Sequence, residues 1–419
     1  MTMAENKDEK VLNVPHLRFP EFSEEWEICK VSELLDFYST NSLSWEQLEY
    51  GTKAMMNLHY GLIHVGLPTM VDLTRDNLPN IKEDNMPKNF ELCKEGDVAF
   101  ADASEDTNEV AKPIEFFDLA GKNIVCGLHT IHGRDNKNKT VIGFKGYAFS
   151  SSVFHNQIRR IAQGTKIYSI STKNFSECFI GIPSKVEQTK IATLLRLIDE
   201  RIATQNKIIE DLKKLKSAIS KHLFARKDLL ETTICLSNIA TLKNGYAFQS
   251  SKYNALGKWK ILTITNVSGE RYINDEDCNC IINLPNDIQD HQVLKEGDIL
   301  ISLTGNVGRV SLCKNGDYLL NQRVGLLQLA KNVNQEFLYQ ILSSQKFENS
   351  MIACGQGAAQ MNIGKGDVES YVLPYSSNGN NILWVAKILH SYDECIINEM
   401  RRLTLLTMQK QYLLTQMFI

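Results

Sequence analysis

Two stretches of the chain carry the apolar pattern of long helices that pack along one narrow seam. In the first stretch the seam positions alternate in steps of four and three residues, with one polar exception: Ile191, Leu195, Ile198, Ile202, Gln205, Ile209 and Leu212. A stretch near the C-terminus has the same spacing and a more polar seam: Ile396, Glu399, Leu403, Leu406 and Leu413. This periodicity predicts two coiled-coil helices. We expect them to pack antiparallel against each other, with Gln205 opposite Glu399.

The segments that precede these helices also resemble each other. Residues 94–97 (KEGD) match residues 295–298, an offset of 295 − 94 = 201, and the Asp-Glu pair at 199–200 matches 393–394, an offset of 393 − 199 = 194. Glycine-rich stretches and Pro-containing junctions match in the same order between these points. Ordered correspondences with a slowly drifting offset predict an internal duplication, and therefore a pseudo-twofold repeat.

Each half otherwise consists of short apolar runs that end in turn residues, such as the run after the turn at 295–298. The predicted class is α/β (α+β), with two strand-rich globular domains joined by the two antiparallel helices. We expect a flexible leader at 1–13, the first domain at 14–183, the first spacer helix at 184–226, the second domain at 227–376 and the second spacer helix at 377–419. About 33 residues of helix would give a rod of roughly 50 Å, long enough for two domains to reach successive turns of one DNA duplex.

Composition narrows the class of protein. The chain has 419 residues and a formal net charge of −3, so it has no global basic signature, although local basic patches remain compatible with a nucleic-acid partner. No run approaches the ~20 apolar residues of a membrane span. The charged start lacks the apolar core of a signal peptide. We therefore expect a cytoplasmic protein without membrane contact.

Cysteines and histidines give no clear metal pattern in the sequence. The ten cysteines are scattered, and the close pair Cys278 and Cys280 lacks a second pair or a histidine cluster at zinc-site spacing. His129 and His132 lie near Asp135, but without a third partner they are interpreted as turn or surface histidines. The prediction is reduced thiols, no metal and no catalytic residue.

The second half contains a candidate DNA-contacting segment. A predicted buried strand ends at the loop 304–309 (TGNVGR), and Asn, Gln and Arg follow at 321–323; these three side chains can pair with adenine or guanine edges. A tight turn with surface polar groups, or salt bridges of Arg309 and Arg323, would explain the same residues. Over both halves, the candidate DNA-binding residues are Ser104, Thr107, Lys112, Arg134, Arg159, Lys166, Thr304, Gly305, Asn306, Arg309, Asn321, Gln322 and Arg323.

Several motifs, in order and nearly end to end, resemble one known family. They are the opening at 14–22 (VPHLRFPEF) followed by Trp26, the junction at 182–199 with its Glu187-Gln188 pair, and the second-half residues 297–309 and 321–322. The chain resembles the specificity (S) subunits of type I restriction-modification systems. The second junction, 373–379, departs from the pattern because Ser, Asn and Gly replace the Glu-Gln pair.

The resemblance implies a fold and a function. Each half would be a target recognition domain that reads one part of a split DNA sequence, and the helices would set the separation and hold two modification (methyltransferase) subunits. Restriction subunits would join the full complex in a bacterial or archaeal cytoplasm. The chain would bind no cofactor, since S-adenosylmethionine would sit in the modification subunits.

The chain's own motifs agree with a non-catalytic subunit, because neither an amino-methyltransferase motif nor a phosphate-binding loop is present in the sequence. Two alternatives remain open at this point. One is a coiled-coil protein adaptor without DNA specificity, and the other is a self-contained methyltransferase or nuclease.

Overall fold

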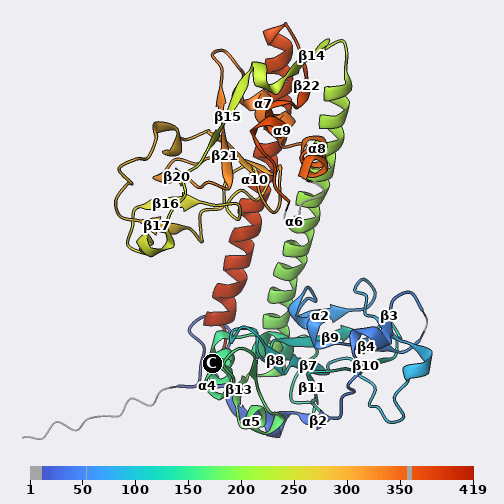
Figure 1. Cartoon of the computed structure of the whole chain (residues 1–419). Coiled ribbons are helices and arrows are strands. Elements are labelled where there is room, and N and C mark those ends of the chain that lie inside the picture. The colour runs from blue at the N-terminus through green and yellow to red at the C-terminus, as the bar shows by residue number, and fades with distance from the viewer. Residues whose placement is uncertain (1–11, 53, 356–360) are drawn as a thin grey trace, which may run out of the picture. The chain divides into compact units, whose positions relative to one another are not determined.

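The computed structural model describes residues 12–52, 54–355 and 361–419, and it divides the chain into two compact units (Figure 1). The first unit combines the described residues up to Gln205 with Arg402–Ile419, and the second is Asn206–Arg401. Each unit therefore contains one half of each long helix. Most of the predicted leader, residues 1–11, lies outside the described part of the chain.

Strands dominate the first unit outside the long helices. One sheet has the order β2-β11-β7-β9-β5 and another the order β10-β4-β6-β3, while β1 pairs with β13 and β8 with β12. The strands are β1 (Glu27–Lys30), β2 (Asp36–Tyr38), β3 (Leu48–Glu49), β4 (Met56–Leu58), β5 (Met70–Asp72), β6 (Asn80–Ile81), β7 (Val98–Ala101), β8 (Ala103–Ser104), β9 (Pro113–Asp118), β10 (Ile124–Cys126), β11 (Thr130–Arg134), β12 (Tyr168–Ser169) and β13 (Phe179–Ile182). Short helices complete this module: α1 (Val31–Leu34), α2 (Tyr60–His64), α3 (Lys145–Phe149), α4 (Ser152–Ile161) and α5 (Thr172–Ser176).

The second unit is built in the same way. Its sheets have the orders β15-β21-β18-β19 and β17-β16-β20, and β14 pairs with β22. The strands are β14 (Thr232–Cys235), β15 (Ala240–Asn244), β16 (Trp259–Leu262), β17 (Asn279–Ile281), β18 (Ile299–Ser302), β19 (Val310–Leu312), β20 (Tyr318–Leu320), β21 (Val324–Leu329) and β22 (Val372–Tyr375). Its short helices are α7 (Gln335–Leu342), α8 (Gln345–Gly355) and α9 (Lys365–Glu369). We call β1 to β13 the first module and β14 to β22 the second module.

The strand orders confirm the predicted duplication. The order β2-β11-β7-β9 in the first module corresponds to β15-β21-β18-β19 in the second, and β10-β4-β6 corresponds to β20-β16-β17. The directions agree as well, because β10 is parallel to β4 and β20 is parallel to β16, whereas the corresponding pairs of the larger sheets are antiparallel. The two modules therefore share one topology.

The two spacer helices are α6 (Lys185–Ala225) and α10 (Gly379–Gln416), and α6, with 41 residues, exceeds the expected 33 or so. In each unit their halves run antiparallel, as predicted. In the first unit Leu195 of α6 and Leu413 of α10 belong to one apolar core, and in the second unit Leu223 and Leu389 do. The predicted seam positions are all buried or half-buried. Gln205 is buried and Glu399 half-buried, but they belong to different units, so their facing each other stays a prediction.

The caps explain how α10 begins without the Glu-Gln pair. At the start of α6, the backbone N–H of Glu187 donates to the Ser184 hydroxyl (3.3 Å). At the start of α10, the backbone N–H of Asn380 donates to the Asn378 side-chain oxygen (3.0 Å). Ser and Asn are both favoured N-caps, and 378 − 184 = 194 matches the repeat offset. The altered second junction therefore still starts a helix at the equivalent position.

Candidate nucleic-acid interface

In the second module the structure brings the two predicted DNA-contacting segments together. The backbone N–H of Leu303, the residue after β18, donates to the carbonyl of Arg323 (3.0 Å). The loop 304–309 therefore lies beside residues 321–323, which we call the β20–β21 turn. The Ser302 hydroxyl closes the loop by accepting from the backbone N–H of Arg309 (3.1 Å). Gly308 has a φ of +80°, and a Cβ there would lie 2.6 Å from Met351, so glycine is required at this position.

The exposed side chains of this site are those of Asn306, Gln322 and Arg323, whereas Thr304, Gly305 and Arg309 are half-buried. Within the described part of the chain, no ion pair involves Arg323. Arg309 instead lies near Glu348 (Nε to Oε1, 3.5 Å). Of the two arginines, Arg323 is therefore the one whose guanidinium is available to a ligand.

Asn321 differs from its neighbours because it is buried. Its side-chain oxygen accepts from the backbone N–H of Arg323 (3.1 Å). Pairing with an adenine edge uses both the oxygen and the nitrogen of the amide. Because the Asn321 oxygen is engaged within the turn and the side chain is buried, the prediction that Asn321 pairs with a base is corrected. Asn321 holds the turn that presents Gln322 and Arg323.

In the first module, five of the six predicted residues lie in or beside the segment 103–112. Ser104 ends β8, and Thr107 and Lys112 lie in the segment that follows. Lys112 is half-buried and pairs with Glu109 (2.7 Å), while the exposed Arg159 donates to the side chain of Asn108 (2.9 Å). The exposed Lys166 lies in the segment just before β12, and β12 pairs with β8 at Ser104. All first-module candidates except Arg134 thus belong to one surface group.

His129 in the first module stands at the position equivalent to that of Arg323 in the second module. From the sequence, His129 was not identified as a candidate DNA contact. In the first module the backbone N–H of Asp102 donates to the carbonyl of His129 (3.0 Å), as Leu303 does to Arg323. The offsets are 303 − 102 = 201 and 323 − 129 = 194, the two offsets of the repeat. His129 is exposed, and its Nδ1 lies 3.1 Å from an Asp102 oxygen. Extending the repeat alignment through 127–129, the β10–β11 turn, would have found it.

A row of aromatic side chains adjoins His129. The ring of Tyr60 lies 5.1 Å from that of His129 and 4.8 Å from that of His59, and His59 is followed by Trp45 at 4.5 Å. Trp45 is exposed. An exposed ring that packs on other rings presents a rigid flat face with little conformational freedom to lose on binding. No periodic pattern in the sequence predicts this row, because its members come from a 3-10 turn at Trp45, the start of α2 and the β10–β11 turn.

Arg134 does not belong to this surface, so its prediction as a DNA contact is wrong. It is buried, and it donates twice to Asp97 (2.8 and 2.9 Å) and once to Glu91 (2.6 Å). Its guanidinium lies 4.4 Å from the centre of the Tyr38 ring. Burial opposes ionisation of Asp97, but hydrogen bonds from His132 and Arg134 hold the pKa of this carboxyl below its ordinary value. Arg134 therefore stabilises the module from inside.

His132 is also misplaced by the sequence interpretation. It is fully buried on β11 rather than at a turn or on the surface. Its Nε2 lies 2.7 Å from an oxygen of Asp97. The ten cysteines are free thiols, as expected, and two of them lie close to His132.

Comparisons with known proteins agree with this architecture. Residues 231–408 match the family described as type I restriction modification DNA specificity domain. The MjaVIII type I restriction enzyme specificity subunit of Methanocaldococcus jannaschii is 29% identical over 45% of this chain and 49% of its own length. The chain thus matches about half the length of this relative. The putative MjaX specificity subunit of the same organism is 23% identical over 84% of each chain. Residues 231–408 are therefore similar to this DNA specificity domain, and most of the chain is similar to type I restriction enzyme specificity subunits.

The fold of one solved S subunit extends over nearly the whole chain. A crystal structure of a type I restriction-modification S subunit from M. genitalium superposes with a TM-score of 0.55 at 18% sequence identity, covering 97% of this chain and 99% of that one. Both spacer helices lie within this match. Among the described residues, no helix is both long and apolar enough to cross a membrane.

Proposed function

We propose that this chain is the sequence-specific DNA-binding subunit of a type I restriction-modification complex, with each module reading one part of a bipartite target. The observation that carries the proposal is the repeated turn. His129 and Arg323 stand at equivalent positions, both exposed, and the same backbone hydrogen bond holds each turn. Two equivalent presenting turns, one in each module, are what two half-sites require.

The side chains at the two turns differ, and this supports different half-sites. Arginine can donate two hydrogen bonds to guanine in the major groove, whereas a neutral histidine offers one donor and one acceptor. The first module also carries Lys112, Arg159 and Lys166 in or beside the segment 103–112, and these side chains can neutralise phosphates locally although the whole chain is slightly acidic. Phosphate contacts would position each module, and the turn residues would specify bases.

The spacer helices carry a surface that fits protein partners. In the first unit, Leu405, Met408 and Tyr412 on α10 are 65%, 62% and 58% exposed. Their spacing of three and four residues places them on one face of the helix. An exposed apolar stripe marks a protein contact. We assign it to a modification subunit; the complex would hold two such subunits, and restriction subunits would join it in the cytoplasm.

In this account the chain has no catalytic role of its own. Methyl transfer, with S-adenosylmethionine as donor, would occur in the modification subunits, and this chain would choose the site. The test is methyl transfer to plasmid DNA by the purified modification subunit with and without this chain. Methylation confined to a few specific sites, and dependent on the chain, supports the proposal. Methylation that is the same without the chain would overturn it and leave an adaptor role.

A further inference from the structure

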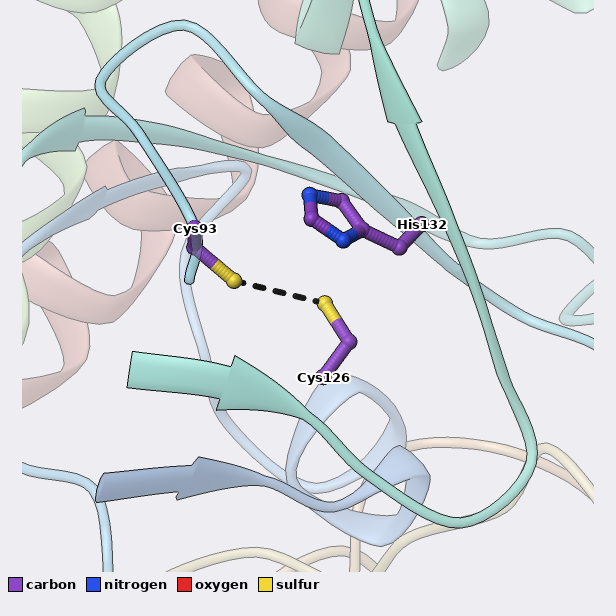
Figure 2. A group of neighbouring side chains, drawn as sticks. All are labelled: Cys93, Cys126 and His132. Carbon is purple, nitrogen blue, oxygen red and sulfur yellow. Dashed lines mark hydrogen bonds between the residues drawn. The ribbon is translucent and has the colours of Figure 1, made fainter. Parts of the chain in front are cut away.

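Three side chains with metal-binding atoms meet inside the first module. Cys93 precedes β7, Cys126 ends β10, and His132 lies on β11. Their exposed fractions are 5%, 2% and 0%. The two sulfur atoms lie 3.6 Å apart, and one ligand atom from each of the three residues lies within 4.8 Å of the others (Figure 2).

His132 is oriented as a metal ligand would be. Its Nε2 faces Asp97 at 2.7 Å, and Asp97 is itself fixed by two hydrogen bonds from Arg134. Its other ring nitrogen, Nδ1, is buried and has no hydrogen-bond partner among the described residues. Figure 2 shows one ring nitrogen directed toward the two sulfur atoms. Histidines that bind metals commonly donate their second N–H to a carboxylate, which fixes the tautomer and the ring.

The second module has the same topology, so the residues equivalent to Cys93, Cys126 and His132 can be identified there. The backbone N–H of Cys93 donates to Ile124, and that of Leu294 donates to Tyr318, both at 2.9 Å. Cys126 and Leu320 end the equivalent strands β10 and β20. His132 pairs with Ala99 as Leu326 pairs with Leu300. The equivalents of Cys93, Cys126 and His132 are therefore Leu294, Leu320 and Leu326.

Those three leucines belong to one apolar core cluster of the second module. The shared topology therefore needs only apolar side chains at these positions. In the first module the same three positions carry two thiols and an imidazole, and the imidazole Nδ1 has no hydrogen-bond partner among the described residues. A buried polar atom without a partner is unfavourable, and a metal ion at this point would satisfy it.

We propose that Cys93, Cys126 and His132 bind one zinc ion in the first module. Two zinc–sulfur bonds of about 2.3 Å at a tetrahedral angle separate the sulfurs by about 3.8 Å, close to the 3.6 Å observed. Binding releases the two thiol protons. Two thiolates neutralise the divalent charge, and Asp97 and Arg134 already balance each other. Three protein ligands leave one position of a tetrahedral ion for water.

The ion would connect parts of the module that carry the presenting turn. Cys126 belongs to the sheet β10-β4-β6-β3 and His132 to the sheet β2-β11-β7-β9-β5. The β10–β11 turn, which contains His129, lies between these two ligands in sequence. Zinc would therefore fix both ends of the segment that presents His129. This consequence rests on the proposed function, whereas metal binding itself does not.

The test is the metal content of the full-length chain, purified without chelators and measured by inductively coupled plasma mass spectrometry. We expect about one zinc per chain. Cys93→Ser, Cys126→Ser and His132→Gln should each lower the zinc content at least about tenfold. Cys178→Ser is the matched control, because Cys178 is a buried thiol of the same unit outside the cluster, and it should retain the zinc.

A second measurement does not depend on how well the variants fold. The metal-free wild-type chain, titrated with cobalt(II), should develop thiolate charge-transfer absorption and the strong visible bands of tetrahedral cobalt. The triple variant Cys93→Leu, Cys126→Leu and His132→Leu, which copies the second module, should fold and show neither band. A wild-type chain without zinc and without the cobalt spectrum, or with Cys93 and Cys126 joined as a disulfide, would overturn the proposal. Neither measurement uses DNA, so a negative result would overturn the zinc site without contradicting the proposed function.

Discussion

Lys410 of α10 forms an ion pair with Asp199 of α6 at 2.6 Å, inside the first unit. The second unit contains the same pair with the helices exchanged, because Lys216 of α6 lies 2.6 Å from Asp393 of α10. The offsets are 410 − 216 = 194 and 393 − 199 = 194, which is the repeat offset of the helices. The duplication therefore extends from strand order to individual side-chain contacts along the seam.

The two aspartates should differ in their contribution to stability. Asp393 also accepts hydrogen bonds from Arg271 (2.9 Å) and Gln340 (2.5 Å), and all of these side chains are buried or nearly so. Asp393→Ala leaves Arg271 with one carboxylate in place of two, so we expect a loss of about 3–5 kcal/mol. Asp199→Ala removes contacts to Lys410 and the Tyr147 hydroxyl, and it should cost about 1–2 kcal/mol. Urea unfolding of both variants measures the difference, and equal losses would contradict this assignment.

Arg323→Ala should weaken DNA binding without destabilising the chain. The side chain is exposed, and no ion pair involves it within the described residues. If it pairs with a base, we expect a loss of about 1–3 kcal/mol and relaxed specificity at one base pair. Fluorescence anisotropy with the assembled complex and a set of target variants measures both. A uniform loss over all sequences would instead identify a phosphate contact.

Arg134→Ala is the matched arginine control for this experiment. Because Arg134 is buried and bound to Asp97 and Glu91, its removal should lower the free energy of unfolding, by about 3–5 kcal/mol. Where the variant folds, its base preference should be that of the wild type. A change in base preference at a single position of the target would indicate that Arg134 contacts a base.

Asp275 should make the second module sensitive to acid. The hydrogen bond from Lys314, with those from Lys260 and Tyr318, holds the pKa of this carboxyl well below its ordinary value, although partial burial opposes this. A depressed folded-state pKa gives a stabilisation that is complete above the unfolded value of about 3.9 and is lost as the pH falls below it. Asp275→Asn should therefore cost about 2 kcal/mol at neutral pH, and less in progressively stronger acid. Denaturant titrations over this range test the trend, and a cost independent of pH would contradict it.

The exposed stripe on α10 should be required for binding the modification subunit. Replacing Leu405 and Met408 by Glu places two charges on the face that also carries Tyr412, all three of which are exposed. Co-purification with the modification subunit should fall at least about tenfold, since burying unpaired charges in an interface is costly. Leu256→Glu is the control, because Leu256 is 91% exposed in the second module. If the variant with Glu at both positions co-purifies with the modification subunit as well as the wild type does, this surface is not the binding site.

The long-range order of this protein could be predicted because it repeats. Heptad spacing depends only on local helix geometry, so the seam from Ile191 to Leu212 was predictable without tertiary information. The duplication was visible in turn residues such as Gly96 and Gly297, which have φ values of +83° and +88°. Glycine is favoured at such angles, so both copies keep it and the alignment is detectable.

The individual contacts could not be predicted, because they depend on strand pairing. Cys93 and Cys126 are separated by 33 residues, and only the pairing of Cys93 with Ile124 brings their sulfurs together. Arg134 was expected at the surface, yet β11 is buried along its whole length and the carboxylate of Asp97 binds the Arg134 guanidinium inside the module. Asn321 was expected to read DNA, yet its oxygen closes the turn that presents Arg323. Local sequence identifies the loop but does not decide which of its side chains point outward.

The most direct test of the central claim is genome-wide mapping of methylated adenines in cells that carry this chain with its modification partner, compared with cells that lack the chain. The account predicts one split motif, two short specified blocks separated by unspecified bases, that disappears when the chain is removed. With Arg323→Ala, one of the two blocks should lose specificity while the other stays intact. Methylation that does not depend on the chain, or a single continuous motif, would contradict the account.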